Sequence, residues 1–299
     1  MLRDEKILIT GSTSQVGLPV ARELARHNEV HGLARFAKVD DRRRMQEIGV
    51  RCHALDLAAD SFDAVPDDFD VVLHFAVVKT GDWDFDLVAN AGGTGRLMAH
   101  CRRARAFLHC SSAGVYAEDP SEPRAESSPL GDNHRVLLPT YSICKIAAEA
   151  VARFGATQWK LPTTIARLSV PYGDNGGWPW VHVMMMKSGV PIPVHVDAPS
   201  VYNPIHEDDI VEQIPRLLEI AAVPAEVINW GGAPVGLEEW CAHIASLTHL
   251  EPVLHPTADT LRGLPVDVTR MRELVGETRV DWRDGIRRMI SARAPELLV

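Results

Sequence analysis

Short apolar runs alternate with amphipathic stretches through the first half of the chain, and this alternation constrains the fold more than any other feature. Runs of strand length occur at 6–10, 29–34, 51–54, 71–76, 105–111 and 163–168, and helical patterns occur at 16–27, 89–103 and 141–154. Strands that alternate with helices form right-handed β-α-β units, which build a parallel sheet covered by helices on both faces. We therefore predict an α/β fold with a doubly wound parallel sheet.

The charge and hydropathy of the chain exclude several classes of function. The 299 residues include 31 basic and 40 acidic side chains, which give a formal net charge of −9. A nucleic-acid-binding surface needs the opposite sign, so we expect no nucleic-acid partner. The N-terminus shows no signal-peptide pattern, and no apolar stretch approaches the length of a membrane span. We expect no membrane association and a cytoplasmic location.

The cysteines and histidines point to neither disulfides nor a metal site. The five cysteines contain no C-x-x-C pair, which favours a reduced chain. The 13 histidines contain no H-E-x-x-H pattern. The acidic segment GDWDFD, with Asp82, Asp84 and Asp86, could bind a hard cation, but a solvated loop explains it more simply. We therefore expect no metal.

The segment ILITGSTSQVG, residues 7–17, joins the first predicted strand to the first predicted helix. Glycines at both ends of such a turn are typical of loops that hold a dinucleotide at the N-terminus of a helix. The position of the middle glycine, which lets the backbone approach the pyrophosphate, is occupied by Ser14. We expect the Ser14 hydroxyl to shift the loop slightly and to offer a donor to a phosphate oxygen.

A tyrosine and a lysine stand four residues apart in YSICK, residues 141–145, and so share one face of a helix. A free tyrosine has a pKa near 10, and a lysine ammonium one turn away favours its ionised form. Such a pair can act as a general acid and base. Ser112 follows a predicted strand, where its hydroxyl can hold a substrate oxygen while Tyr141 exchanges a proton with it.

Taken in order, these motifs resemble those of the extended short-chain dehydrogenase/reductases, the group that includes sugar-nucleotide epimerases, dehydratases and related ketone reductases. The resemblance runs over nearly the whole chain through TGSTSQVG, HFAVVK, NAGGTGRLMAHCRRA, FLHCSSAGVYA, PTYSICKIAAEA, RLSVPYG, YNPIHEDDIVEQI and VINWGG. It implies a Rossmann-type sheet with a smaller C-terminal substrate lobe. The crowding of Gly and Pro after Tyr172 agrees with a change of architecture there.

The resemblance also implies a division of the chain. Residues 1–172 with about 201–231 are expected to form the dinucleotide-binding domain. Residues 173–200 with about 232–299 are expected to form the substrate lobe.

The resemblance assigns catalytic roles to matching residues. The catalytic Ser, Tyr and Lys of the family fall on Ser112, Tyr141 and Lys145, and its helix Asn, which supports a proton-relay water, falls on Asn90. The expected cofactor contacts follow the strand ends and are Gly11, Ser12, Thr13, Ser14, Gln15, Val16, Gly17, Arg35, Asp56, Leu57, Phe75, Ala76, Val77, Lys79, Tyr141, Lys145, Pro171 and Tyr172.

The second predicted strand ends in EVHGLAR, with Ala34 where NAD-specific sites carry an acid and with Arg35 after it. An arginine pairs with a 2′-phosphate and has no comparable partner in NAD. We expect NADP as the cofactor, with NAD as the alternative. A solvated surface charge is the plain alternative for Arg35, and an exposed helix face is the simpler explanation of Arg42–Arg44.

Two departures from the family pattern bear on the substrate. Sugar-nucleotide epimerases of the family usually carry an Asn and an Arg where this chain has Val170 and Tyr202, and both groups contact the nucleotide diphosphate. We therefore expect an NADP-dependent oxidoreductase that interconverts a small carbonyl and its alcohol. The alternative is an NAD(P)-dependent epimerase or dehydratase acting on a sugar or sugar nucleotide.

The small lobe offers Trp178, Trp180, His182 and Met184–Met186, which could line an apolar pocket, although packing in the lobe's own core suits the Met run better. His134, in a loop expected over the mouth of the site, is a candidate substrate contact. The helices at 89–103 and 141–154 are expected to pack against their copies in a homodimer.

Overall fold

A computed structural model describes residues 2–58, 61–118, 122–197 and 199–299. Its centre is a parallel seven-stranded sheet with the strand order β12-β6-β5-β4-β1-β2-β3. From β1 the chain adds β2 and β3 on one side, and then β4, β5, β6 and β12 on the other. The point between β1 and β4 is therefore the topological switch point, where ligands bind in sheets of this type. The strands are β1 (Lys6–Thr10), β2 (Glu29–Ala34), β3 (Arg51–Ala54), β4 (Val71–His74), β5 (Ala106–Ser112), β6 (Thr163–Leu168) and β12 (Glu226–Trp230).

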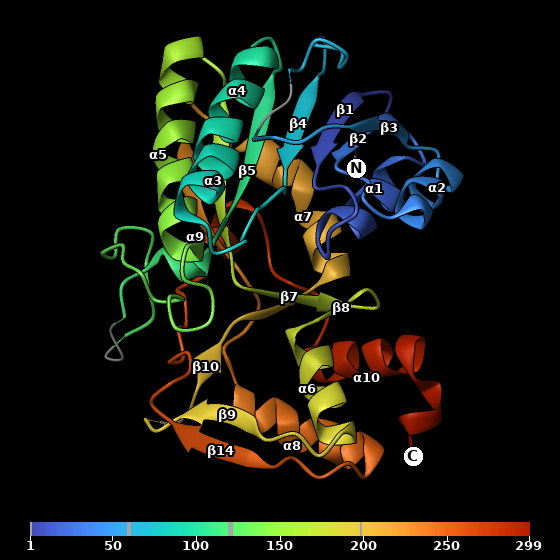
Figure 1. Cartoon of the computed structure of the whole chain (residues 1–299), viewed down its shortest axis with the longest axis vertical. Helices are drawn as coiled ribbons and strands as arrows, with labels where there is room; N and C mark the ends of the chain where they lie inside the picture. Colours follow the sequence, from blue (N-terminus) through green and yellow to red (C-terminus); the bar gives the residue numbers. More distant parts are fainter. Residues whose placement is uncertain (1, 59–60, 119–121, 198) are drawn as a thin grey trace.

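Helices cover both faces of this sheet, as Figure 1 shows. One face packs against apolar side chains of α1 and α7, and the other against those of α4 and α5. Burial on both faces explains the consecutive apolar residues of the central strands, such as Ile7–Ile9 of β1 and Val71–Leu73 of β4. The helices of this part are α1 (Gly17–Leu24), α2 (Val39–Glu47), α3 (Trp83–Leu87), a π-helical turn (Val88–Gly92), α4 (Gly93–His100), a 3₁₀ turn (Ala113–Val115), α5 (Tyr141–Trp159), α7 (Glu207–Glu219) and α9 (Thr269–Leu274).

A smaller lobe lies beyond the carboxyl ends of the strands (Figure 1). Its core is an apolar cluster that includes Val183, Trp240 and Ile286. Its elements, with the small sheets that connect it to the main one, are β7 (Val170–Gly173), β8 (Gly176–Gly177), α6 (Trp178–Lys187), β9 (Ile192–His195), β10 (Val201–Tyr202), β11 (Pro204–His206), β13 (Val235–Gly236), α8 (Leu237–Thr248), β14 (Leu254–Thr257), α10 (Trp282–Arg293) and a 3₁₀ turn (Pro295–Leu297).

The predicted doubly wound sheet with a smaller lobe is confirmed, while the packing crosses the expected division of the chain. Tyr202 of β10 packs in the small-lobe cluster, although residues 201–231 were expected in the larger unit. Met271 of α9 packs on the main sheet, although residues 232–299 were expected in the lobe. The division into domains therefore stays a prediction.

Several sequence features outside the site find plain structural explanations. Arg43 pairs with Glu47 at 3.1 Å on the exposed face of α2. Asp86 is buried and accepts hydrogen bonds from Thr80 and Thr140, so it anchors a loop. The five cysteines are free thiols. No helix of the described chain has both the length and the apolarity needed to cross a bilayer.

Candidate active site

The turn between β1 and α1 is held tightly at both of its glycines. Gly11 has a φ of +65°, and a Cβ there would come within 2.8 Å of the Ala76 backbone. A Cβ on Gly17 would lie 2.2 Å from the carbonyl oxygen of Gly11. Any larger residue at either position would therefore force the turn open.

Ser14 acts inside this turn as a helix cap. Its hydroxyl oxygen accepts the Gly17 amide at 3.0 Å, and its own amide donates to the Gly11 carbonyl at 2.9 Å. The Ser14 hydroxyl oxygen uses one lone pair to accept this hydrogen bond, and its proton remains available. The geometry is therefore compatible with the expected donation from Ser14 to a phosphate oxygen.

The turn leaves donors where a pyrophosphate would lie. Within the described chain, the amides of Thr13, Gln15 and Val16 make no intramolecular hydrogen bond. Free amides at a helix N-terminus, together with the positive end of its dipole, form an anion site. The residues of the turn thus fit a dinucleotide phosphate, although Ser12 contributes nothing visible because its hydroxyl is buried without a partner.

A chain of buried hydrogen bonds that sequence analysis missed connects this turn to the helix of Asn90. The Ala76 amide donates to Thr10 Oγ1, which lies 2.6 Å from His74 Nδ1, and His74 Nε2 lies 3.0 Å from Thr94 Oγ1. Thr94 donates onward to the Asn90 carbonyl, so Thr94 must accept from His74 Nε2. Burial lowers the pKa of His74 to about 3, so the ring is neutral. With its one proton on Nε2, the ring accepts from the Thr10 hydroxyl at Nδ1.

The Asn90 side chain fastens the segment that follows β4. It accepts the Val78 amide at 2.9 Å and donates to the carbonyls of Val78 and Asp86, each at 2.7 Å. These bonds hold the predicted cofactor segment that contains Phe75, Ala76 and Val77. Both side-chain N–H groups of Asn90 are therefore used for positioning, and the expected support of a proton-relay water by Asn90 stays a prediction.

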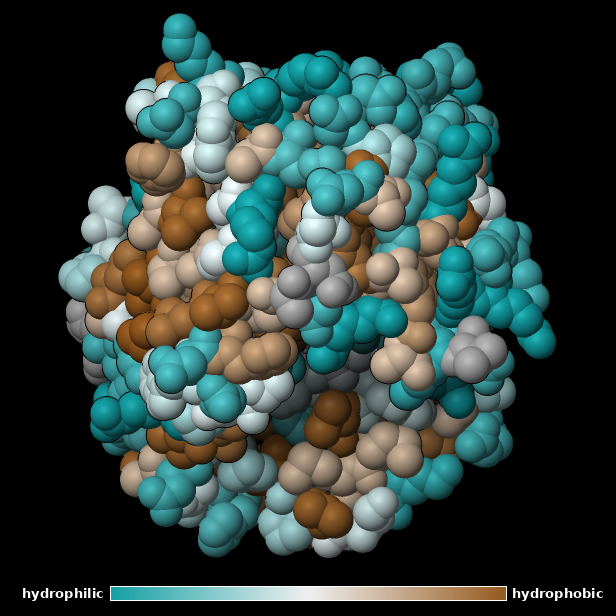
Figure 2. Space-filling view, turned by 45° about the horizontal axis from the view of Figure 1, so that its top comes forward, coloured by the Kyte–Doolittle hydropathy of each residue, from teal (hydrophilic) through white to brown (hydrophobic). Residues whose placement is uncertain are grey.

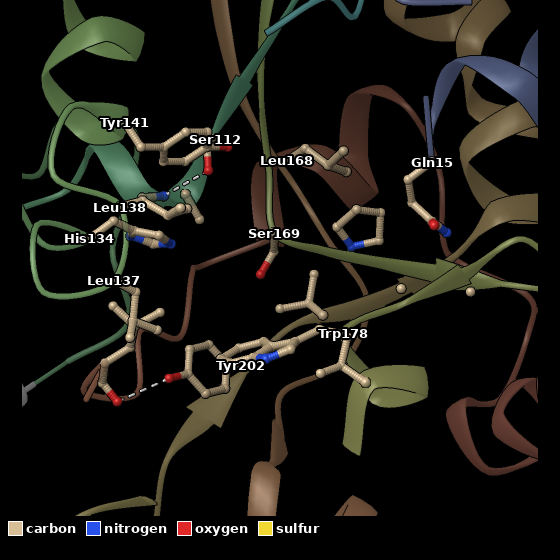
Figure 3. Close-up of a pocket in the computed structure, with 18 of the residues that line it drawn as sticks. Gln15, Ser112, His134, Leu137, Leu138, Tyr141, Leu168, Ser169, Trp178 and Tyr202 are labelled. Carbon is tan, nitrogen blue, oxygen red and sulfur yellow. Dashed lines mark hydrogen bonds between the residues drawn. The ribbon is translucent and has the colours of Figure 1, made fainter. Parts of the chain in front are cut away.

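Ser112, Tyr141 and Lys145 are brought together by the end of β5 and the start of α5. The Ser112 hydroxyl accepts the Gly114 amide at 3.1 Å, which fixes the serine rotamer (Figure 3). Lys145 is buried and donates to the Cys110 carbonyl at 2.7 Å. Burial raises the pKa of Tyr141 to about 12 and the Ser112 hydroxyl opposes that rise. The phenol is therefore protonated and ready to donate.

Ser112 and Tyr141 open onto a cavity of about 670 Å³ between the sheet and the small lobe, whereas buried Lys145 is not among the described residues that line it. The predicted residues Gln15, Lys79, Ser112, Tyr141 and Pro171 line it. Figure 3 shows the last residues of β5 and β6 on one side and Trp178 and Tyr202 on the other. The lining that sequence analysis did not assign includes Leu137, Leu138, Leu168, Ser169, Asn175, Val181, Leu261, Leu264 and Arg293.

The wall toward the small lobe is apolar and aromatic. Trp178 stacks edge-on against Tyr202, with 4.9 Å between ring centroids. The Tyr202 hydroxyl donates to the Leu261 carbonyl at 3.3 Å, so its polar end is already engaged. Of the other lobe candidates, Trp180 also lines the cavity, while buried His182 accepts from Trp240 and Met186 packs in the lobe core.

The remaining predicted cofactor residues lie along the carboxyl edge of the sheet, with one exception. Arg35 is exposed after β2, and Asp56 after β3 accepts the Ala58 amide at 2.8 Å. The Leu57 carbonyl accepts from Arg96. Tyr172 instead turns into the lobe, where its ring packs against His206, so from this pair only Pro171 faces the cavity.

A scan against family models matches the NAD dependent epimerase/dehydratase family over residues 7–231, most of the chain. The chain belongs to this family. The matched segment contains the turn after β1 and the set Ser112, Tyr141 and Lys145. The protein is thus an enzyme of the extended short-chain dehydrogenase/reductase type, as its sequence motifs indicated.

Curated relatives of this epimerase/dehydratase-family chain are distant. A trifunctional UDP-glucose 4,6-dehydratase/UDP-4-keto-6-deoxy-D-glucose 3,5-epimerase/UDP-4-keto-L-rhamnose-reductase of Arabidopsis thaliana is 23% identical over 96% of this chain and 46% of its own length. A dTDP-D-glucose 4,6-dehydratase of Homo sapiens is 25% identical over 74% of this chain and 67% of its own length. The chain therefore spans about half the length of the plant enzyme.

Solved structures show the same fold. A UDP-glucuronic acid 4-epimerase from Bacillus cereus, in complex with UDP-glucuronic acid and NAD, superposes with a TM-score of 0.82 at 20% identity, over 96% of this chain and 98% of that one. A UDP-N-acetylglucosamine 4-epimerase from Methanobrevibacter ruminantium, in complex with UDP-N-acetylmuramic acid, gives 0.83 at 15% identity, over 99% and 100%. At these sequence identities, the similarity to solved structures establishes only the fold of this family member and not its substrate.

Proposed function

We propose that the protein is a nicotinamide-dependent epimerase or dehydratase that transiently oxidises a hydroxyl-bearing carbon of a sugar or sugar nucleotide. The observation that carries this proposal is that Ser112 and Tyr141, with Lys145 one helical turn from Tyr141 on α5, lie at one end of a cavity whose other border includes Gln15 of the dinucleotide turn. The names of the relatives favour this reaction over the net reduction of a small carbonyl that the sequence favoured.

The chain's own groups suit proton transfer at one oxygen. A bound nicotinamide supplies or accepts the hydride. Tyr141 exchanges the proton of the substrate oxygen, Ser112 holds that oxygen, and Lys145 provides a nearby positive charge that favours the phenolate once the proton has left. The free amides of the turn and Arg35 are suited to the pyrophosphate and to a 2′-phosphate, so NADP is the proposed cofactor, with NAD as the alternative.

A second candidate, the net reduction of a small carbonyl, is favoured by the lobe-facing wall. Val170 and Tyr202 replace the amide and the cation that the family uses for a nucleotide diphosphate, and the Tyr202 hydroxyl is bound to a backbone carbonyl. The cations that line the cavity within the described chain are Lys79 and Arg293, and Arg293 is stacked on Trp180. This wall suits an uncharged group better than a diphosphate.

Product analysis separates the two reactions. Enzyme loaded with NADP or NAD is incubated with UDP-glucose, UDP-glucuronic acid or dTDP-glucose, and the sugar is followed by NMR. Conversion without net cofactor change, absent in Tyr141→Phe, supports the epimerase or dehydratase. Stoichiometric NADPH oxidation with a panel of carbonyl compounds, together with no binding of UDP or GDP, supports the second candidate. If neither reaction occurs, both proposals are wrong.

A further inference from the structure

His134 lies in the cavity beside the proposed proton donor. Its ring centroid is 5.4 Å from that of Tyr141, and its ring also lines the cavity. A Cβ on Gly114 would come within 2.7 Å of the imidazole, so the ring packs directly on a bare backbone. Figure 3 shows the imidazole on the same side of the cavity as Ser112 and Tyr141. The glycine thus makes room for a histidine next to the reacting oxygen.

The orientation of this imidazole is fixed by its neighbours. The His134 amide donates to Ser142 Oγ at 3.2 Å, which ties the loop to α5. Nδ1 is hydrogen-bonded to the side-chain carbonyl oxygen of the buried Asn133. Because that oxygen can only accept, Nδ1 carries the proton and Nε2 presents a lone pair. Within the part of the chain that the structure describes, Nε2 has no protein partner.

The lone pair is unusual in this cavity. Burial, helped by the charge of Lys79, lowers the pKa of His134 to about 4, so the ring is neutral near pH 7. No carboxylate stands among the described residues that line the cavity. Tyr141 and Ser112 are both engaged with the reacting oxygen in the proposed reaction. The other side-chain acceptors of the lining, Gln15, Ser169 and Asn175, belong to other segments of the wall. Beside the Tyr141 ring, a second substrate hydroxyl meets His134 Nε2 as an acceptor.

We propose that His134 Nε2 accepts a hydrogen bond from a hydroxyl on the carbon next to the reacting one, so that the site selects vicinal diols and α-hydroxy carbonyls. This inference rests on the proposed function, because it takes Tyr141 and Ser112 to hold the reacting oxygen. His134 then determines specificity by direct contact with the substrate, and Asn133 is a positioning residue that acts through it. No proton transfer by His134 is required.

A pair of probes that differ by one hydroxyl tests this role. Calorimetric titration of the NADPH-loaded protein with 1-phenylethane-1,2-diol and with 1-phenylethanol measures binding without turnover, because neither alcohol can be reduced. The phenyl ring suits the apolar wall, and the second hydroxyl is the only difference. We expect the diol to bind about fivefold to tenfold more tightly, the scale of one added hydrogen bond.

Variants separate the acceptor from its packing. His134→Phe keeps a ring against Gly114 and removes the acceptor, so the two probes should bind equally. Asn133→Leu should reduce the ratio because the imidazole tautomer is no longer fixed, and Asn133→Asp, which still accepts from Nδ1, should retain it. Leu138→Ala changes the cavity wall without removing the acceptor and is the matched control, in which affinities fall together and the ratio stays.

Two results overturn the inference. The first is a wild-type protein that binds both probes equally or binds neither. The second is a preference for the diol that His134→Phe leaves unchanged. Failure of the proposed function can be recognised separately. It would show as turnover of a sugar or carbonyl compound that survives Tyr141→Phe, or as no turnover at all. The ratio of the two probe affinities does not depend on turnover.

Discussion

Lys145 of α5 donates to the backbone carbonyl of Cys110 in β5 at 2.7 Å, which places a buried ammonium at the end of the central sheet. Burial lowers the pKa of Lys145, since charge is costly away from water. Within the described chain the carbonyl, and no carboxylate, is its hydrogen-bond partner, so the positive charge is not neutralised by an ion pair.

This relationship predicts a double loss in Lys145→Ala. Turnover should fall roughly a hundredfold or more, the scale of impaired acid–base catalysis. Cofactor affinity should fall as well, because in the family the same ammonium reaches the nicotinamide ribose. Steady-state rates and a fluorescence titration with NADPH measure the two effects. A variant that binds NADPH like the wild type would contradict the cofactor role.

Tyr141→Phe separates proton transfer from binding. The phenol is the group placed to donate a proton, so turnover should drop roughly a hundredfold or more while NADPH binds almost normally. Ser112→Ala should reduce turnover less than either other variant, because it holds an oxygen and exchanges no proton. An active phenylalanine variant would remove Tyr141 from the mechanism.

The sheet could be predicted well from the sequence because its central strands are buried on both faces. The observed β1, β2, β3 and β6 have the predicted bounds, and β4 and β5 differ from theirs by one or two residues. The order of motifs then located the family. Strand β12 was not predicted, because its short apolar run lies outside the strand–helix alternation of the first half of the chain.

Other features could not be read from periodicity. The predicted helix at 89–103 is a π-helical turn at Val88–Gly92 followed by α4, which ends at His100, and the short helix α3 directly precedes it. A single π turn is too short to have a period that the sequence could show. One side of the cavity is formed by Leu261, Leu264 and Arg293, from the last part of the chain. These residues are far in sequence from the other lining residues and come close to them only in the folded chain. The neutral His74 between two threonines likewise depends on strand register.

Cofactor preference is tested by Arg35→Asp. Arg35 is exposed after β2, at the strand end where the ribose of a dinucleotide lies in this fold. An aspartate there repels a 2′-phosphate and can bind free ribose hydroxyls, so the affinity for NADP should fall and that for NAD should rise. Dissociation constants for both cofactors measure the change. A wild type that already prefers NAD would show that the argument from EVHGLAR is wrong.

Acid should destabilise the fold partly through His74. Its pKa is about 3 in the folded chain, whereas an unfolded histidine titrates near 6.5. Between these values the unfolded state binds a proton that the folded state does not, so the stability is fully present above about pH 6.5 and is lost as the pH falls.

His74→Gln should therefore reduce the dependence of the unfolding free energy on pH by about 1.4 kcal/mol per pH unit below about pH 6. Urea unfolding at several pH values measures this slope. The exposed His255→Gln is the control, which should keep the wild-type slope. An unchanged slope in His74→Gln would contradict the neutral state assigned to this residue.

Self-association is expected through α4 and α5. Phe154 of α5 is 61% exposed, a large apolar side chain left in water by a single chain. Figure 2 shows apolar surface gathered on the left, the side on which α4 and α5 lie in Figure 1. Burial of such a face against a second copy removes apolar area from water, which favours a homodimer.

Light scattering at micromolar concentration should therefore give the mass of a dimer. Phe154→Glu should shift it toward the monomer because a charge is then forced into the contact. Leu274→Glu should not, because Leu274 is exposed on α9, which packs on the opposite face of the sheet. A monomeric wild type, or equal effects of both substitutions, would contradict this interface.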